Sequence, residues 1–199
     1  MARPARITND QILEAARAVF LEQGYAAPTA EVARRAGVSE GSVFKRFPTK
    51  NDLFLAALGT SELPDWLSSL DGRVGQGSPR ETCVEVVRQS IDFFRKLLPC
   101  AVMMWSSKAT SPLDVLRSAP DPPPRRSVAA LTRYLAGERR LGRVRTEDPE
   151  VAARLLLAAA HQFVFFEMVG MLPDGGRDAN AFAQQAVELL WTGLGPEGE

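Results

Sequence analysis

Residues 29–47 read TAEVARRAGVSEGSVFKRF, and this stretch decides the fold expected for the first part of the chain. Thr29 is a favourable N-cap for a first short helix. Gly37 is placed to end that helix, because glycine adopts the left-handed backbone conformation without steric cost. Ser39 is a favourable cap for a second short helix. Two short helices joined by a turn that contains glycine form a helix-turn-helix.

The second of these helices has a small, polar outer face. A rotation of about 100° per residue turns both Val43 and Phe47 toward the interior. The same rotation leaves Gly41, Ser42 and Lys45 on the outside. Little bulk, a hydroxyl and a cation suit a helix that enters the major groove of DNA. The alternative is that these polar side chains only cover a solvated helical hairpin.

The first fifty residues are basic, although the whole chain has no net charge. Residues 1–50 contain eight Lys or Arg and five Asp or Glu, a net charge of +3, and the rest of the chain therefore carries −3. A basic end joined to an acidic body indicates a polyanionic partner for the first part only.

Helical patterns recur along the whole sequence, whereas the alternation typical of strands is missing. Thr8 with Gln11, and Thr49 with Asp52, have the spacing of a capping box. A long amphipathic helix is expected to stop before Pro99, with a separate short helix after it. These patterns predict an all-α protein.

The order of residues around the helix-turn-helix resembles the DNA-binding domain of the TetR family of bacterial transcriptional repressors. The resemblance covers roughly residues 7–55. We therefore expect about nine helices, with a helix-turn-helix DNA-binding domain at residues 1–48 and a larger helical domain at residues 49–199 for ligand binding and dimerisation. The matching residues are Ala15, Phe20, Gly24, Tyr25, Thr29, Val32, Ala33, Ala36, Gly37, Val38, Ser39, Gly41, Phe44, Phe47, Lys50, Asp52 and Leu53.

The resemblance also implies which residues touch DNA. Residues 39–46 are the implied recognition helix. The family usually has tyrosine where this chain has Phe44, so one hydroxyl that would contact a phosphate is missing. Relatives often have lysine at the position of Glu40, whose carboxylate would repel a nearby phosphate. The implied DNA contacts are Thr29, which would meet a phosphate, Ser39, Gly41, Ser42, Phe44, Lys45, Arg46 and Lys50.

By this resemblance the protein is a DNA-binding transcriptional regulator, a dimeric repressor that a ligand releases from a palindromic operator. Two-fold half-sites lie about 34–36 Å apart on DNA, so a ligand that changes the spacing of the two recognition helices weakens binding. The alternatives are an activator of the same type and a helical protein-interaction module that does not bind DNA.

Aromatic and methionine side chains are the candidates for an effector pocket, and they indicate a small, mainly hydrophobic molecule. The same residues at helical spacing also pack an ordinary core. His161, the only histidine, is either part of this pocket or a hydrogen-bonded residue that is buried or lies at an interface. The pocket candidates are Trp66, Phe93, Phe94, Met103, Met104, Trp105, His161 and Phe165.

The last two predicted helices are apolar around most of their circumference, so each must be buried on more than one side. They form either the core of a monomer or a four-helix interface between two copies related by a two-fold axis. The interface candidates are Leu156, Phe163, Phe166, Phe182, Ala186, Leu190 and Trp191.

Other classes of protein find little support in the sequence. Cys83 and Cys100 have apolar neighbours, which favours two core side chains over a redox switch. Patterns for a metal site, a nucleophile elbow and a phosphate-binding loop are missing, so we expect no enzyme, no metal and no cofactor. The start MARPARITND lacks the apolar region of a secretory signal and no apolar run reaches about 18 residues. We therefore expect a cytoplasmic protein with no membrane partner.

Overall fold

The computed structural model describes residues 8–57, 64–105, 123–171 and 178–194. These residues contain nine α-helices, one short 3-10 helix and no strand, so the predicted all-α fold is confirmed. The chain divides into two compact units. Unit 1 comprises Met1–Glu62 and Pro99–Ala119, and unit 2 comprises Leu63–Leu98 and Pro120–Glu199.

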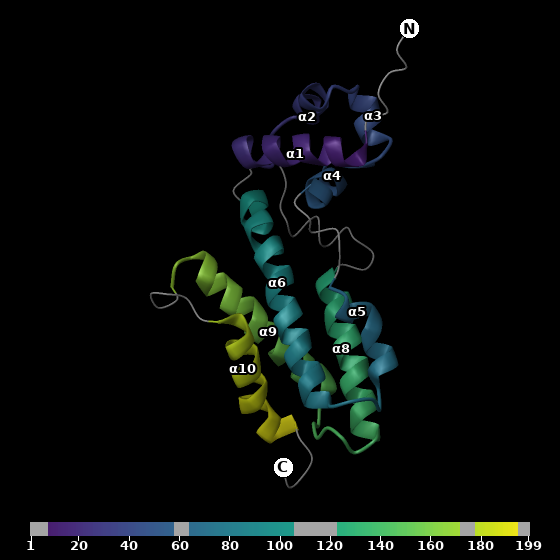
Figure 1. Cartoon of the computed structure of the whole chain (residues 1–199), viewed down its shortest axis with the longest axis vertical. Helices are drawn as coiled ribbons and strands as arrows, with labels where there is room; N and C mark the ends of the chain where they lie inside the picture. The colour runs from purple at the N-terminus through teal and green to yellow at the C-terminus, as the bar shows by residue number, and fades with distance from the viewer. Residues whose placement is uncertain (1–7, 58–63, 106–122, 172–177, 195–199) are drawn as a thin grey trace. The chain divides into compact units, whose positions relative to one another are not determined.

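Unit 1 is a small helical domain in which α1 packs against both α2 and α4, and α2 packs against α3 (Figure 1). The helices begin where the sequence places capping residues. Thr8 and Gln11 form the predicted capping box at α1. Thr49 and Asp52 cap α4 in the same reciprocal way. The described helices of this unit are α1 (Asn9–Gln23), α2 (Thr29–Ala36), α3 (Glu40–Phe44) and α4 (Lys50–Ala57).

Aromatic rings hold α1 and α4 together at the centre of unit 1. The ring centroid of Phe54 lies 5.0 Å from that of Phe20 and 4.9 Å from that of Tyr25, both with edge-to-face geometry. Val43 of α3 is 0% exposed in the same cluster. A helix of five residues is not stable by itself, so burial of Val43 is what holds α3 in place.

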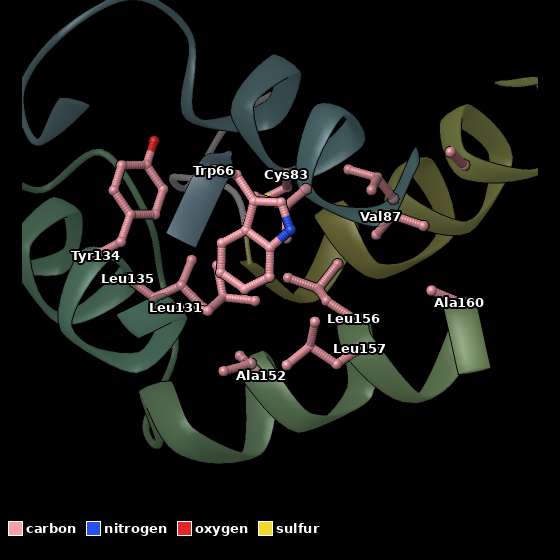
Figure 2. Packing of buried hydrophobic residues seen from close by; sticks show 14 of the residues in the cluster. Trp66, Cys83, Val87, Leu131, Tyr134, Leu135, Ala152, Leu156, Leu157 and Ala160 are labelled. Carbon is pink, nitrogen blue, oxygen red and sulfur yellow. The ribbon is translucent and has the colours of Figure 1, made fainter. Parts of the chain in front are cut away.

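Unit 2 has its own core. Trp66 is 1% exposed, and Figure 2 shows its ring among Leu131, Leu135 and Leu156. Helices that follow one another in the sequence pack together, α8 against α9 and α9 against α10. The elements of this unit are α5 (Trp66–Ser69), the 3-10 helix η1 (Leu70–Arg73), α6 (Pro79–Trp105) as far as Leu98, α8 (Pro123–Arg140), α9 (Pro149–Met168) and α10 (Ala179–Leu194).

Helix α6 continues through Pro99, so the prediction that it stops there was wrong. Pro99 has no N–H to donate to the carbonyl of Arg95, which removes one hydrogen bond of the helix. Both residues are exposed, and water can therefore satisfy that carbonyl. Leu98 before the proline packs in the core of unit 2, and Met103 after it packs in the core of unit 1. Burial on both sides of Pro99 offsets the loss.

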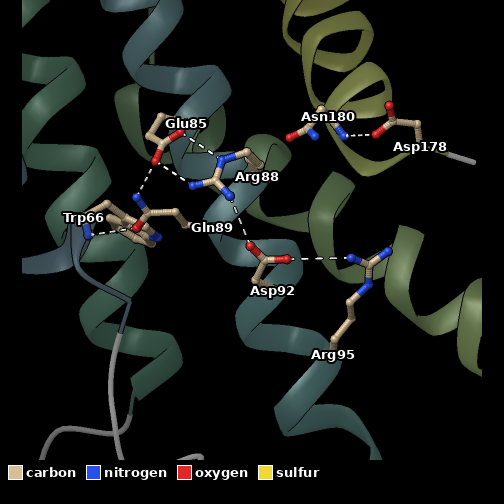
Figure 3. A network of polar contacts seen from close by, with 8 residues as sticks. All are labelled: Trp66, Glu85, Arg88, Gln89, Asp92, Arg95, Asp178 and Asn180. Atoms are coloured by element: carbon tan, nitrogen blue, oxygen red, sulfur yellow. Dashed lines mark hydrogen bonds and ion pairs between the residues drawn. The ribbon is translucent and has the colours of Figure 1, made fainter.

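A polar network on α6 holds the start of α5 (Figure 3). The Gln89 side chain accepts a hydrogen bond from the backbone N–H of Trp66 at 3.3 Å and donates to Glu85 at 2.5 Å. Arg88 donates to both carboxylate oxygens of Glu85, at 3.0 and 2.8 Å, and to Asp92 at 3.2 Å. The hydrogen bond from Arg88 is the main reason why the pKa of Glu85 falls from 4.5 to about 2.

Helix α9 is, among the described helices, the one long and apolar enough to cross a membrane when only length and composition are considered. Asp148 caps it by accepting hydrogen bonds from the backbone N–H groups of Glu150 and Val151, at 2.8 and 3.2 Å. Leu156 and Phe163 of α9 are fully buried in unit 2. A core helix of a folded domain has the same composition, so α9 is weak evidence for a membrane span.

Candidate nucleic-acid interface

The turn between α2 and α3 has the predicted geometry. Gly37 adopts φ 70° and ψ 30°, the left-handed conformation that ends α2. Ser39 caps α3, because its hydroxyl oxygen accepts from the N–H of Ser42 at 3.2 Å. The two serine hydroxyls also lie 2.8 Å apart. The turn and the cap together fix the direction in which α3 leaves α2.

Helix α3 and the residues after it have the predicted orientation. Val43 is fully buried and Phe47 is half-buried against the core of unit 1. Lys45 and Arg46 are exposed, and Ser42 is half-buried beside its cap. The cationic side chains therefore face away from the core, as a helix that contacts DNA requires.

Three further residues define the surface of α3. An ideal Cβ on Gly41 would meet no atom within 4 Å, so the helix surface is open there. Phe44 is 38% exposed, which is unusual for a ring of this size. Arg46 donates through Nη1 to the carbonyl of Ser42 at 3.1 Å, which turns its side chain back along the helix.

Lys50 begins α4 beside an aromatic ring. Its ammonium lies 5.0 Å from the centroid of the Tyr25 ring, within the range of a cation–π contact. Partial burial lowers the pKa of Lys50 from 10.5. The contact holds the ammonium at one place at the start of α4.

The two arginines of α2 are bound to acids of their own unit. Arg34 donates to both oxygens of Glu31, at 2.8 and 2.6 Å, and Arg35 does the same to Glu22, at 2.9 and 2.8 Å. These hydrogen bonds lower the pKa of both carboxyls and raise the pKa of both guanidinium groups. Two of the eight basic side chains in residues 1–50 are thus paired with acids of the same unit. The three-residue spacing of Glu31 and Arg34 is a signal that the sequence reading missed.

Thr29 is not the N-cap of α2. Pro28 occupies that position without a side-chain hydrogen bond, and Thr29 is the first helical residue. The prediction was wrong because the fixed φ of proline lets the helix start one residue earlier. The Thr29 side chain is 8% exposed, and its hydroxyl donates to a carboxylate oxygen of Glu40 at 2.5 Å. The two residues are eleven positions apart, and this separation hides the contact from sequence analysis.

The predicted pocket residues are divided between the two units. Trp66 lies in the core of unit 2, whereas Met103 packs on the core of unit 1. Trp66 Nε1 and Ser90 Oγ are buried and have no hydrogen-bond partner in the described part of the chain. The side chains of Met104 and Trp105 lie outside the described residues.

The other pocket candidates lie on α6 and α9. Phe94 packs against the core of unit 2, and its ring centroid lies 5.8 Å from Phe93 and 5.4 Å from His161. His161 and Phe165 are exposed. His161 is therefore not buried within this chain, and its place at an interface or in a pocket stays a prediction.

The predicted dimer residues are also of two kinds. Within a single chain Leu156, Phe163 and Trp191 are buried in the core of unit 2. The apolar faces that carry them cover the core of their own chain, and their place in an interface between two chains stays a prediction. The remaining candidates are half-buried, and they are Phe166, Phe182, Ala186 and Leu190.

Other apolar side chains on α9 and α10 are more exposed than these candidates. Val151 and Leu155 project from α9, and Leu189 of α10 is 79% exposed. Large exposed apolar residues that gather on neighbouring helices mark a surface for association. The sequence periodicity indicated that α9 is apolar on most sides, but it did not indicate which apolar side chains are buried and which are exposed.

Neither a metal site nor a reactive thiol emerges from the described residues. They contain no group of three His, Cys, Asp or Glu side chains that could hold a metal ion. Cys83 is fully buried, and this burial raises the pKa of its thiol from 9.0 to about 12. A thiol in this state is unreactive, in agreement with the core interpretation of Cys83, whereas the side chain of Cys100 lies outside the described residues.

Two family profiles match the sequence. The profile described as bacterial regulatory proteins of the tetR family matches residues 12–57, which include the helix-turn-helix. The profile described as the C-terminal domain of AefR-like transcriptional repressors matches residues 104–192. Both matches point to a non-enzymatic DNA-binding regulator.

Solved structures of the same kind share the fold. A TetR-family regulator from Mesorhizobium loti is 22% identical, covers 98% of this chain and 100% of its own, and has a TM-score of 0.67. FadR of Bacillus subtilis, solved with stearoyl-CoA, is 18% identical over 94% of this chain and 99% of its own, with a TM-score of 0.67. SmeT, repressor of the Stenotrophomonas maltophilia multidrug efflux pump SmeDEF, is 23% identical over 97% and 93%, with a TM-score of 0.67.

Proposed function

This chain belongs to the TetR family of bacterial transcriptional regulators, and from this membership we propose that it is a cytoplasmic, dimeric repressor that a small hydrophobic effector releases from a palindromic operator. The orientation of α3 carries the proposal. Val43 anchors this helix in the core while Lys45 and Arg46 point outward. A helix that is anchored in the core and followed by exposed cationic side chains can be positioned on DNA by contacts of these side chains with the phosphates.

Repression is the direction that the second profile supports, because its description is that of a transcriptional repressor. An activator would have the same DNA-binding unit, since the direction of regulation depends on where the operator lies relative to the promoter. Transcription from a reporter promoter that carries the operator of this protein distinguishes a repressor from an activator. Lower transcription in the presence of the protein is expected, and higher transcription would identify an activator.

The exposed apolar side chains of α9 and α10 support a dimer. Leu155 and Leu189 are both exposed, and α9 and α10 pack together within one chain. Two copies joined through this pair of helices would bury these side chains in a four-helix arrangement. We expect Leu189→Asp to give monomers in sedimentation, because a carboxylate is costly to bury without a partner.

A mutation at an exposed position tests the interface without removing core residues. Leu21→Asp is the control, since Leu21 is 60% exposed on α1 of the other unit. A Leu189→Asp protein that sediments as the same dimer as the control would show that another surface joins the two copies.

The effector is proposed to bind within unit 2. Its core combines the Trp66 ring with aliphatic side chains of α8 and α9, and such side chains suit contact with a mainly hydrophobic molecule (Figure 2). Trp66 Nε1 and Ser90 Oγ, both buried in unit 2, offer it a donor and a hydroxyl. FadR was solved with stearoyl-CoA and SmeT represses a multidrug efflux pump, which agrees with a bulky apolar effector.

Helices that belong to the DNA-binding unit would transmit the signal. Helix α4 follows α3 directly, and α6 runs from unit 2 into unit 1 at Pro99. An effector can weaken DNA binding only if it binds the DNA-free conformation more tightly than the DNA-bound one. Operator affinity that stays constant with every bound ligand of a hydrophobic panel would contradict effector release.

The decisive experiment is selection of bound fragments from a genomic DNA pool, followed by footprinting. We expect a palindrome whose half-sites lie about one helical turn, or a multiple of it, apart. Affinity for the selected duplex should fall steeply as salt is raised, because counterions are released from the phosphates on binding. A protein-interaction module predicts no selected sequence and no salt-dependent binding of DNA.

A further inference from the structure

Glu40 places a negative charge at the start of the proposed recognition helix. It is the first residue of α3 and is exposed. Its carboxylate accepts a hydrogen bond from the Thr29 hydroxyl at 2.5 Å. The position is favourable for an acid, because the N-terminus of a helix carries a partial positive charge. The only hydroxyl proton of Thr29 is thereby used inside the protein.

We propose that Glu40 is an internal competitor for DNA phosphate, which occupies the Thr29 hydroxyl in the free protein and must give it up when DNA binds. The inference rests on the proposed function and on the contact between Thr29 and a DNA phosphate that the family resemblance implies. A carboxylate and a phosphate are both anionic acceptors, and one hydroxyl proton serves only one of them at a time. Glu40 therefore sets DNA affinity below the value that the neighbouring cations alone would give.

The local charges decide the sign of this effect. Lys45 and Arg46 follow Glu40 within two turns, and Lys50 begins the next helix. Glu40 has no ion-pair partner among the described residues, whereas Glu31 on the preceding helix is neutralised by Arg34. Glu40 is thus a carboxylate beside these cations that no ion pair balances, and it repels an approaching phosphate.

The substitution Glu40→Gln tests the proposal, because glutamine keeps an oxygen that can accept from Thr29 and removes the charge. The probe is a fluorescein-labelled DNA duplex of mixed sequence, since contacts to phosphate do not depend on sequence. We expect Glu40→Gln to bind this duplex about 10-fold more tightly than the natural protein near 0.1 M salt, as one fewer repelled phosphate implies. Glu14→Gln, which removes an exposed acid from α1 of the same unit, is the control for net charge.

A double-mutant cycle with Thr29→Val separates capture of the hydroxyl from simple repulsion. If Glu40 competes for that hydroxyl, Glu40→Gln tightens binding more when Thr29 is present than when valine replaces it. Equal tightening in both backgrounds, or tightening no larger than that of Glu14→Gln, would overturn the proposal. Failure of the natural protein to bind any duplex at low salt would instead refute the proposed function and the inference with it.

Discussion

The α3 segment of unit 1, which is α3 with the two basic residues that follow it, and helix α6 carry their basic side chains in different ways. In the α3 segment Lys45, the C-cap of the helix, is exposed and has no ion-pair partner among the described residues. On α6, Arg88 holds Glu85 and Asp92, and Arg95 holds Glu167 of α9 at 2.8 and 2.9 Å. The α3 segment offers charge to a partner, whereas α6 uses charge within its own unit.

The difference shows that the number of basic residues does not identify a DNA surface. A guanidinium that already holds a carboxylate must break or share that pair before it gains from a phosphate. Arg34 and Arg35 of α2 are in this position, although they lie in the basic part of the sequence. Basic side chains not committed to an acid are therefore the better guide to the DNA-binding face.

Removal of the two cations of the α3 segment is expected to have the largest effect. Replacing both Lys45 and Arg46 by alanine should weaken DNA binding about 100-fold near 0.1 M salt and reduce the salt slope by about two, since two phosphate contacts are lost. Fluorescence anisotropy with the selected duplex over a range of salt measures both quantities. The matched control is Arg139→Ala with Arg140→Ala, an exposed basic pair on α8. If both double variants lost DNA affinity equally, Lys45 and Arg46 would be no more important for DNA binding than other exposed basic residues.

Gly41 and Gly137 lie in different surroundings, the first on the open surface of α3 and the second in the packed interior of unit 2. A Cβ on Gly137 of α8 would lie 2.8 Å from Val74 Cγ1, whereas a Cβ on Gly41 would meet nothing within 4 Å. Gly137→Ala gains up to about 1 kcal/mol of helix propensity but costs about 1–3 kcal/mol in overpacking, so it should lower the free energy of unfolding.

Gly41→Ala is the control for Gly137→Ala, because it raises helix propensity without bringing a methyl group against a neighbouring side chain. We expect it to leave stability unchanged or to raise it by up to about 1 kcal/mol. Denaturant unfolding measures both variants. An equal or higher stability of Gly137→Ala would mean that the loop around Val74 yields to the new methyl group.

The smallest effect is expected from Glu85, which shows what the paired charges of unit 2 contribute. Its pKa is lowered from 4.5 to about 2, so its stabilisation is fully present above pH 4.5 and is lost as the pH falls from 4.5 toward 2. Glu85→Gln should therefore lower the free energy of unfolding by about 0.5 kcal/mol near neutral pH, because the partly exposed pair is screened by water. The difference should vanish toward pH 2.

Urea unfolding of this variant at several pH values is the measurement. Glu81→Gln, an exposed acid one turn earlier on α6, is the control. A stability difference between Glu85→Gln and the natural protein that is the same at all pH values would show that the carboxylate is not stabilised by Arg88.

Local signals were sufficient for much of unit 1. The capping box at Thr8, the serine cap at Ser39 and the left-handed turn at Gly37 were all predictable, because each depends on residues within four positions of one another. The continuation of α6 through Pro99 was not predictable in the same way. It depends on Leu98 and Met103 packing into the cores of different units.

The amino-acid sequence by itself determined the all-α class, the helix-turn-helix and the outward direction of Lys45, because helical periodicity and capping are properties of short segments. Only the tertiary structure decided which cations remain unpaired, that Thr29 is held by Glu40, and that Phe163 fills a core. Each of these depends on side chains brought together from distant positions or different helices. Periodicity indicates that a face is apolar or charged, but only packing decides what that face contacts.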